Sequence, residues 1–212
     1  RWSPNHFKTI IVDECHHALA ESWLKVLNHF DSHGSVFGWT ATPSRGDRRS
    51  IGNYFQNFTY EIGMRDLIDQ GYLCPIVLKA LPVQIDMSNV SSVAGDFHQG
   101  QTHQTLIPLL RNIAQQIKQH AQGRKTLVFL PLVETSQMFA NICNEVGLNA
   151  NWVSGSRQDR DLVMKQFKKC DSGLLANALL VSEGVDIPSI DALAILRPTR
   201  SVSFYQQMCG RG

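Results

Sequence analysis

The feature that most constrains this fold is an alternation of short apolar runs, rich in β-branched residues, with longer segments whose apolar residues recur at helical spacing. Residues 7–12 form one such run, and residues 18–30 carry Leu19, Trp23 and Leu27 on one helical face. Strands that alternate with helices form parallel sheets, because each crossover helix returns the chain to the same edge, and helices then cover both faces. The sequence therefore predicts an α/β fold.

The same alternation continues along the chain. The pattern predicts further strands at residues 35–40, 75–83, 126–130, 151–153, 174–181 and 192–196, with residues 35–40 and 174–181 buried. It predicts further helices at residues 64–70, 106–122, 134–146, 157–169 and 202–209. Residues 86–105 are rich in Ser, Gln, His and Gly and have no clear period, which is typical of a connecting segment. We expect two domains, residues 1–80 and 106–212, joined by residues 81–105.

Composition excludes several classes of protein. Of the 212 residues 43% are hydrophobic and the formal net charge is +2, so the chain is not intrinsically disordered. No apolar run reaches the roughly 18–20 residues of a membrane-spanning helix, so we expect no membrane association. The 5 cysteines contain no C-x-x-C pair, which argues against a disulfide framework and a zinc ribbon and favours the reducing cytoplasm. With so balanced a charge, any nucleic-acid surface must come from the local placement of Lys and Arg.

Two adjacent carboxylates, Asp13 and Glu14, directly follow the first strand. In an open parallel sheet the carboxyl ends of the strands face the ligand crevice, where an aspartate can hold Mg²⁺ on a nucleotide and its neighbour can orient a water. By itself, such a pair is more often an acidic helix start. Cys15, His16 and His17 follow, and they cannot hold one zinc ion because consecutive residues of a helical turn point in different directions. His16 is either a hydrogen-bonding relay or an ordinary helix-start residue.

Further polar groups follow other predicted strands. The hydroxyls of Thr40 and Thr42 end the second strand, and Gly184 and Asp186 follow the strand at 174–181, where they could approach a phosphate and a ribose. The alternative for both pairs is an ordinary turn. Residues 123–126 look like the end of a phosphate-binding loop, but Lys118 stands where its first glycine should be, so this is not a P-loop.

The order and spacing of these segments resemble motifs II to VI of the superfamily 2 helicases of the DEAD/DEAH type, here with the variant Asp-Glu-Cys-His. The matching segments are residues 13–16 for motif II, 40–43 for motif III, 126–129 for motif IV, 183–188 for motif V and 207–211 for motif VI. The flanking residues 42–47, 71–73 and 197–201 resemble the branch that holds excision-repair-type helicases and the motor subunits of type I and III restriction enzymes.

The resemblance implies an α/β protein of two RecA-like domains, with parallel sheets flanked by helices, ATP bound between the domains and nucleic acid across both. The first domain would lack its N-terminal part and the second its C-terminal part. The resemblance gives the following residues roles: Asp13 holds Mg²⁺, Glu14 activates water, His16 couples them to Gln207 or to Thr40 and Thr42, and Gly184, Asp186 and Arg211 meet the nucleotide. Arg211 matches the first arginine of the Q-x-x-G-R-x-x-R pattern of motif VI.

The chain departs from the family pattern in the following two features, of which only the first bears on activity. The Walker A loop should precede Asp13 and is not in this chain, so we expect hydrolysis by the parent protein and not by this chain alone. Cys15 stands where many relatives have Ala, which leaves the carboxylate roles unchanged.

The resemblance also implies sequence-independent contacts to the nucleic-acid backbone. The candidates for these contacts are Arg45, Arg160, Arg197, Thr199 and Arg200. We expect an ATP-dependent DNA helicase or translocase, by branch resemblance, with RNA still open and with nuclease or repair subunits as possible partners. The alternatives are the motor subunit of a type I or III restriction enzyme and a nucleic-acid clamp that has lost hydrolysis.

Overall fold

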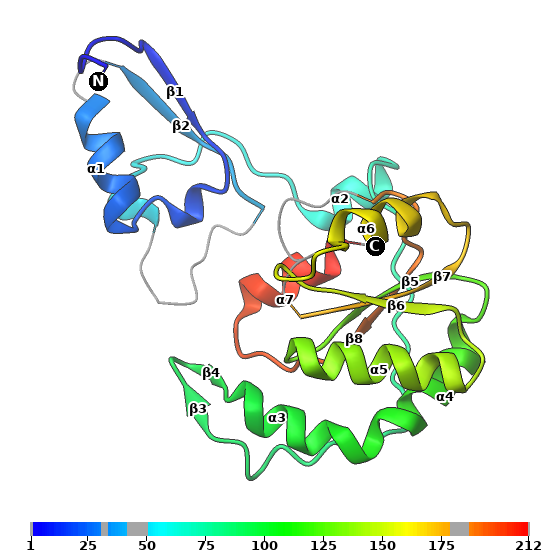
Figure 1. Ribbon diagram of the computed structural model, residues 1–212. Coiled ribbons are helices and arrows are strands. Elements are labelled where there is room, and N and C mark those ends of the chain that lie inside the picture. The colour runs from blue at the N-terminus through cyan, green and yellow to red at the C-terminus, as the bar shows by residue number, and fades with distance from the viewer. Residues whose placement is uncertain (1, 31–33, 42–50, 179–186, 212) are drawn as a thin grey trace. The chain divides into compact units, whose positions relative to one another are not determined.

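The computed structural model describes residues 2–30, 34–41, 51–178 and 187–211. The chain divides into two compact units, Arg1–Pro75 and Ile76–Gly212 (Figure 1). The boundary between them falls after Pro75, at the start of the stretch whose apolar pattern predicts a strand. Each unit has its own sheet and its own core, so we describe them in turn.

The first unit contains a two-stranded parallel sheet with a helix packed on one face. Its elements are β1 (Thr9–Val12), the 3-10 turn Cys15–His17, α1 (Glu21–Phe30), β2 (Ser35–Gly38), the 3-10 turn Ile51–Asn53 and α2 (Met64–Asp69). The strands pair in parallel from Thr9 opposite Ser35 to Val12 opposite Gly38. Leu27 of α1 packs against Val12, Cys15, Ala18 and Ile51 to form the core of this unit.

The strand β2 is mostly exposed, which corrects the prediction of a buried strand at residues 35–40. Side chains alternate between the two faces of a strand. Val36 packs against the core, whereas Phe37 on the other face is 47% exposed. An apolar run predicts a strand, but burial on both faces needs a layer on each side, and the described residues supply only one.

The second unit contains a four-stranded parallel sheet covered by helices on both faces. Its main elements are α4 (Leu110–Ala121), β5 (Lys125–Phe129), α5 (Val133–Glu145), β6 (Ala150–Val153), α6 (Arg160–Lys169), β7 (Gly173–Asn177), β8 (Ala192–Ile195) and α7 (Val202–Cys209). The strand order is β6-β7-β5-β8, and all neighbours are parallel. These elements agree with the predicted ones to within a few residues, except that residues 179–181 of the predicted strand lie outside the described residues.

The burial of the central strand β5 shows why helices cover both faces of the sheet. All five of its residues are buried, and because successive side chains point to opposite faces, they enter two different cores. Val128 packs with the helices α4 and α5, whereas Leu127 and Phe129 pack with α6 and α7. Figure 1 shows α5 and α6 on opposite sides of this sheet. The parallel α/β fold with helices on both faces is thus confirmed.

Residues 76–106 differ most from the sequence prediction. Residues 75–83 form no strand; Val77 and Leu78 are exposed, while Leu81 and Val83 pack on the α4–α5 core. The segment predicted as a connection contains an antiparallel hairpin, β3 (Ser92–Val93) and β4 (Asp96–Phe97), and a helix, α3 (Gln99–Leu106). A 3-10 turn, Ile107–Leu109, separates α3 from α4, so the helix predicted at 106–122 begins only at Leu110.

The polarity of α3 explains why its sequence shows no helical period. Its buried face consists of Thr102, His103 and Leu106, so two of its three buried side chains are polar. An apolar stripe, which is the usual signal of a packed helix, is therefore missing.

Within the described ranges, no helix combines the length and the apolar character that crossing a bilayer requires.

Candidate functional site

The carboxyl ends of β1 and β2 meet at one edge of the first sheet. The Trp39 amide donates to the Val12 carbonyl at 2.8 Å, and the Cys15 amide donates to the Trp39 carbonyl at 2.9 Å. These two bonds fix the turn after β1 against the residues that follow β2. Ligands of open parallel sheets bind at this edge, so the polar side chains of the turn form the candidate site.

Glu14 has a left-handed backbone conformation, with φ 48° and ψ 47°. A residue with a Cβ atom adopts this conformation at a cost of about 1–3 kcal/mol, and such residues cluster at functional sites. The turn is closed by Asp13, whose Oδ1 accepts a hydrogen bond from the Glu14 amide at 2.9 Å. The two carboxylates are therefore held on a sharp, fixed turn at the strand end.

A buried histidine connects the two strand ends. His16 is 5% exposed, and its Nδ1 lies 2.8 Å from Thr40 Oγ1 and 3.3 Å from Glu14 Oε2. The contact with Thr40 is a hydrogen bond whose donor is set by the tautomer of the imidazole, and the contact with the Glu14 carboxylate is an ion pair when the ring is protonated. The structure thus brings together Glu14, His16 and Thr40, three of the residues that the sequence singled out.

Cys15 packs directly against Gly38, where a residue with a side chain would not fit. A Cβ atom at Gly38 would lie 2.7 Å from Cys15 Sγ and 2.7 Å from Phe55 Cζ, which is closer than atoms can approach. Burial raises the pKa of the Cys15 thiol, and the negative charges of Glu14 and Asp13 raise it further. Cys15 is therefore a packing residue under the turn.

The donor set at this edge suits magnesium held mainly by phosphate oxygens. Among the described residues, no group of three or more His, Cys, Asp or Glu side chains could hold a metal ion. Mg²⁺ usually keeps several waters and takes only one or two carboxylates together with substrate phosphates. Asp13 is exposed at the open strand end, so its carboxylate fits that arrangement.

In the second unit, Gln207 and Arg211 lie on and just after α7. Met208 between them is fully buried in the core formed with α6, and this contact fixes the rotation of the helix. Gln207 is half-buried on the helix, and the Arg211 amide donates to the Met208 carbonyl at 3.3 Å. The remaining predicted site residues Thr42, Arg45, Gly184 and Asp186 lie outside the described residues.

The candidate nucleic-acid residues of the second unit are in different environments. Arg197 is 9% exposed, with its guanidinium 4.8 Å from the centre of the Phe204 ring. Burial lowers the pKa of Arg197, and the charge of Asp96 opposes this shift. Arg160 is half-buried at the start of α6, and only Arg200 has an exposed side chain. Arg200 is therefore the candidate best placed to reach a phosphate.

Two polar side chains of the second unit escaped sequence analysis. Asp96 Oδ1 accepts a hydrogen bond from the Arg200 amide at 2.8 Å, and Asp96 Oδ2 accepts one from Thr199 Oγ1 at 2.9 Å. The Nδ1 of His103 lies 2.7 Å from Thr135 Oγ1 inside the helical layer. The only sequence signal at Asp96 is the turn-forming Gly-Asp pair, which says nothing of a partner about a hundred residues away.

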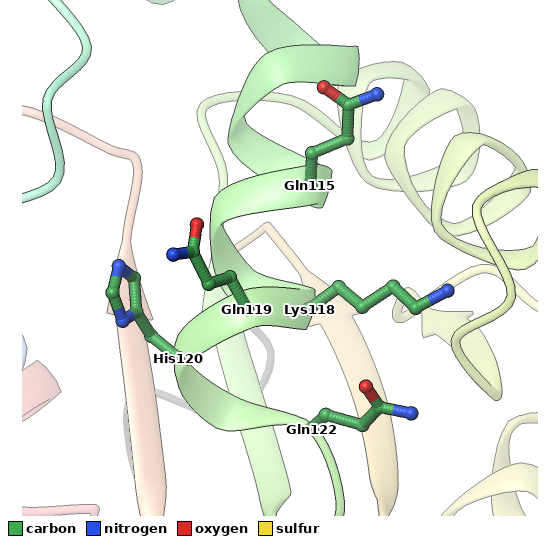
Figure 2. A pocket seen from close by; sticks show the side chains of 5 residues that line it. All are labelled: Gln115, Lys118, Gln119, His120 and Gln122. Carbon is green, nitrogen blue, oxygen red and sulfur yellow. The ribbon is translucent and has the colours of Figure 1, made fainter.

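Residues 123–126, which look like the end of a phosphate-binding loop, and the surface hollow beside them do not resemble a ligand site. Lys125 begins β5, and its Nζ donates to the Lys168 carbonyl at 3.0 Å and to Ser189 Oγ at 2.6 Å, which accounts for this buried lysine. Figure 2 shows the hollow, lined by residues from the end of α4. Its labelled side chains spread outward from a single helix instead of converging on one point.

Comparison with known protein families shows to which family the chain belongs. The model of the helicase conserved C-terminal domain matches residues 104–212, which is more than half of the chain. The chain belongs to this helicase family. The model of the type III restriction enzyme res subunit matches residues 1–45, which contain β1, β2 and the Glu14–His16–Thr40 contact. Together they identify a chain of the superfamily 2 helicase type.

Individual relatives agree with this assignment. A protein of Saccharomyces cerevisiae that carries the name ATP-dependent helicase IRC3 is 29% identical over 100% of this chain, which covers 32% of that protein. The EcoAI endonuclease subunit of a type I restriction enzyme of Escherichia coli is 22% identical over 99% of the chain, which covers 30% of it. The chain thus spans about a third of the length of these relatives.

A solved structure supports the fold. A fragment from Vibrio vulnificus YJ016, described as an HsdR subunit of a type I restriction enzyme, superimposes on 100% of this chain with a TM-score of 0.77 and 24% identity. The chain covers 41% of that structure. This likeness shows that the two chains share a fold, with RecA-like α/β domains.

Proposed function

We propose that the chain is part of an ATP-dependent DNA helicase or translocase, in which ATP hydrolysis between two RecA-like domains drives movement along nucleic acid. Membership of the helicase family supports this proposal. The observation that carries it is the contact of His16 with both Glu14 and Thr40 at the carboxyl edge of the first sheet. A buried histidine that joins two strand ends fits a coupling role better than the role of an ordinary helix-start residue.

The proposed cofactors are ATP and Mg²⁺. Asp13 would hold the magnesium ion, which neutralises charge on the transferred phosphoryl group when bound. Glu14 accepts the proton of the attacking water, and the imidazole of His16 lies against its carboxylate, with Nδ1 3.3 Å from Oε2. Thr40 follows β2, so a displacement of that strand end reaches Glu14 through a single side chain.

The remaining proposed roles belong to residues of both units. Gln207, Arg211, Gly184 and Asp186 meet the nucleotide, and Thr42 shares the coupling role of Thr40. Backbone contacts to DNA come from Arg45, Arg160, Arg197, Thr199 and Arg200, with the exposed Arg200 as the strongest candidate. We also propose a cytoplasmic location, because all five cysteines are free.

A second candidate function is supported by the match of residues 1–45. It is the motor of a restriction enzyme, and the same motor would then act together with nuclease and modification subunits. The two candidates differ in one product: only a restriction motor with its partners cuts DNA when ATP is supplied. Incubation of the purified assembly with unmodified plasmid DNA and ATP therefore separates them.

The experiment that tests the proposed function is steady-state ATP hydrolysis by the full-length protein. It is measured without polymer and with single-stranded DNA, duplex DNA or RNA, at about 50 and 200 mM salt, because contacts to phosphates weaken steeply over this range. We expect strong stimulation by DNA that falls with salt. Stimulation by RNA alone would mean that the substrate is RNA and not DNA. DNA binding without hydrolysis would mean that the protein is a nucleic-acid clamp and not a motor.

A further inference from the structure

The hairpin β3–β4 is fastened to the loop that precedes α7. Its Asp96 uses both carboxylate oxygens, one on the Arg200 amide at 2.8 Å and one on Thr199 Oγ1 at 2.9 Å. The two partners lie more than a hundred residues along the chain from Asp96. Such a contact fixes the loop far more narrowly than local turn bonds, because the hydrogen bonds to a carboxylate are charge-assisted.

The hydrogen bonds continue from this carboxylate into the helix. Thr199 Oγ1, which donates to Asp96, accepts from the Ser201 amide at 3.0 Å. Ser201 is the N-cap of α7, and its Oγ accepts from the Phe204 amide at 3.2 Å. Asp96 thus begins an unbroken series of bonds that ends on the first turn of α7.

Two arginine contacts strengthen the same junction. The guanidinium of Arg200 lies 4.8 Å from the centre of the Phe97 ring, so hairpin and loop also stack on each other. The guanidinium of Arg197 lies 4.8 Å from the centre of the Phe204 ring on α7. Asp96 places a negative charge close enough to offset part of the cost of burying Arg197.

The helix held in this way carries the motif VI residues. α7 has only eight residues, Val202–Cys209, so its N-terminal anchor and the buried Met208 together determine where Gln207 points. Arg211 follows directly, with its amide bonded to the Met208 carbonyl. A displacement of the first turn of α7 therefore also displaces Gln207 and Arg211.

We propose that Asp96 is a positioning residue for Gln207 and Arg211, acting through Thr199, Ser201 and the first turn of α7. This inference rests on the proposed function, in which Gln207 and Arg211 meet the nucleotide. In this role Asp96 acts through Thr199 and Ser201 and not by binding the nucleotide. Its removal displaces groups that act in the transition state, so it lowers kcat for ATP hydrolysis more than it changes KM for ATP.

The test uses the full-length protein with three single substitutions. Asp96→Asn removes the charge and one of the two acceptor oxygens, and Ser201→Ala cuts the same series at its far end. Asp86→Asn is the matched control, because Asp86 is an exposed aspartate of the same segment whose carboxylate accepts a hydrogen bond from the nearby Ser88 amide. Two quantities are measured: DNA-stimulated ATP hydrolysis and amide hydrogen exchange in α7.

We expect kcat to fall about tenfold in Asp96→Asn and in Ser201→Ala, with KM for ATP within about twofold of the wild-type value. The amides of Phe204 and Tyr205 should exchange about tenfold faster in both variants, while Asp86→Asn matches the wild type. Unchanged exchange in α7 would overturn the anchor. Faster exchange with an unchanged kcat would overturn the positioning role, because α7 would then be loosened without consequence for the reaction.

The exchange measurement also separates this inference from the proposed function. If the wild-type protein hydrolyses no ATP with any polymer, the proposed function fails and the positioning of Gln207 fails with it. Exchange rates that still differ between Asp96→Asn and Asp86→Asn would show that the anchor itself exists. If the wild-type protein is active and Asp96→Asn equals it in both readouts, the proposed function stands and this inference is wrong.

Discussion

Each unit contains a buried histidine bonded to a threonine hydroxyl and close to a glutamate. In the first unit His16 Nδ1 lies 2.8 Å from Thr40 Oγ1, and in the second His103 Nδ1 lies 2.7 Å from Thr135 Oγ1. The two histidines are nearly equally buried, at 5% and 4% exposed. The same chemistry therefore occurs twice, and burial does not distinguish the two pairs.

Their locations in the fold do distinguish them. His16 joins the carboxyl ends of two parallel strands, whereas His103 joins the helices α3 and α5. Glu14 has a left-handed backbone conformation, and its Oε2 lies 3.3 Å from His16 Nδ1. Glu134 Oε2 lies 3.8 Å from His103 Nε2, and the Glu134 side chain is 71% exposed. Under the proposed function, we infer that the first pair serves the reaction and that the second holds two helices together.

The largest expected difference between the pairs is at the two glutamates. Under the proposed function, Glu14→Gln in the full-length protein lowers ATP turnover at least about 100-fold, because the general base is lost, and leaves nucleotide binding intact. Glu134→Gln keeps the wild-type rate, because an exposed partner of a histidine contributes little. Steady-state hydrolysis and binding of a fluorescent nucleotide measure both. Near-normal turnover in Glu14→Gln would remove the role assigned to Glu14.

Replacing the two histidines should separate activity from stability. His16→Ala lowers DNA-stimulated turnover about tenfold through loss of coupling. His103→Ala leaves the rate per folded molecule unchanged but lowers the free energy of unfolding by about 2–4 kcal/mol, because a cavity and an unpaired hydroxyl remain. Hydrolysis assays and urea unfolding of both variants measure this contrast. A reversed pattern would assign the functional role to His103.

Smaller effects are expected at the threonines. Thr135 is fully buried, so Thr135→Val removes a hydrogen bond in the interior and costs about 1–2 kcal/mol in urea unfolding. Thr40 is half-buried, so Thr40→Val costs less stability but lowers DNA stimulation a few-fold. Equal losses of stability at the two positions would mean that both pairs are structural.

The smallest expected effect is a dependence of stability on pH. Burial raises the pKa of Cys143 in the second unit to about 12 from an ordinary 9.0. Between these values the folded state keeps a proton that the unfolded state releases, so stability falls as pH rises above 9. The loss from pH 9 to 10 should be about 1 kcal/mol larger in the wild type than in Cys143→Ala. Urea unfolding at both pH values tests this, and equal slopes would contradict it.

The sequence predicts most of the second unit because its pattern and its packing agree. In β5 every residue is buried, and α7 begins and ends where the spacing of its apolar residues indicates. The motif order also located Glu14, His16 and Thr40. Their contact could not be predicted from spacing alone, because it depends on the register that pairs Val12 with Gly38.

The sequence predictions fail where polar side chains do the packing. The helix α3 buries Thr102 and His103, and the hairpin is held by Asp96, so an analysis of apolar periodicity detects neither. The run at residues 75–83 fails for the opposite reason. It has the composition of a strand, but within the described part of the chain it pairs with none, and only alternate side chains find a core.

The left-handed turn at Glu14 has a consequence for how this chain tolerates mutation. Glycine is the residue that this backbone prefers, and Glu14→Gly would relieve the local cost while losing about as much in chain entropy. Under the proposed function such a variant would fold as well as the wild type and hydrolyse nothing. A screen that selects only for soluble expression would therefore accept substitutions at residue 14. A set of variants chosen only because they fold would include inactive ones.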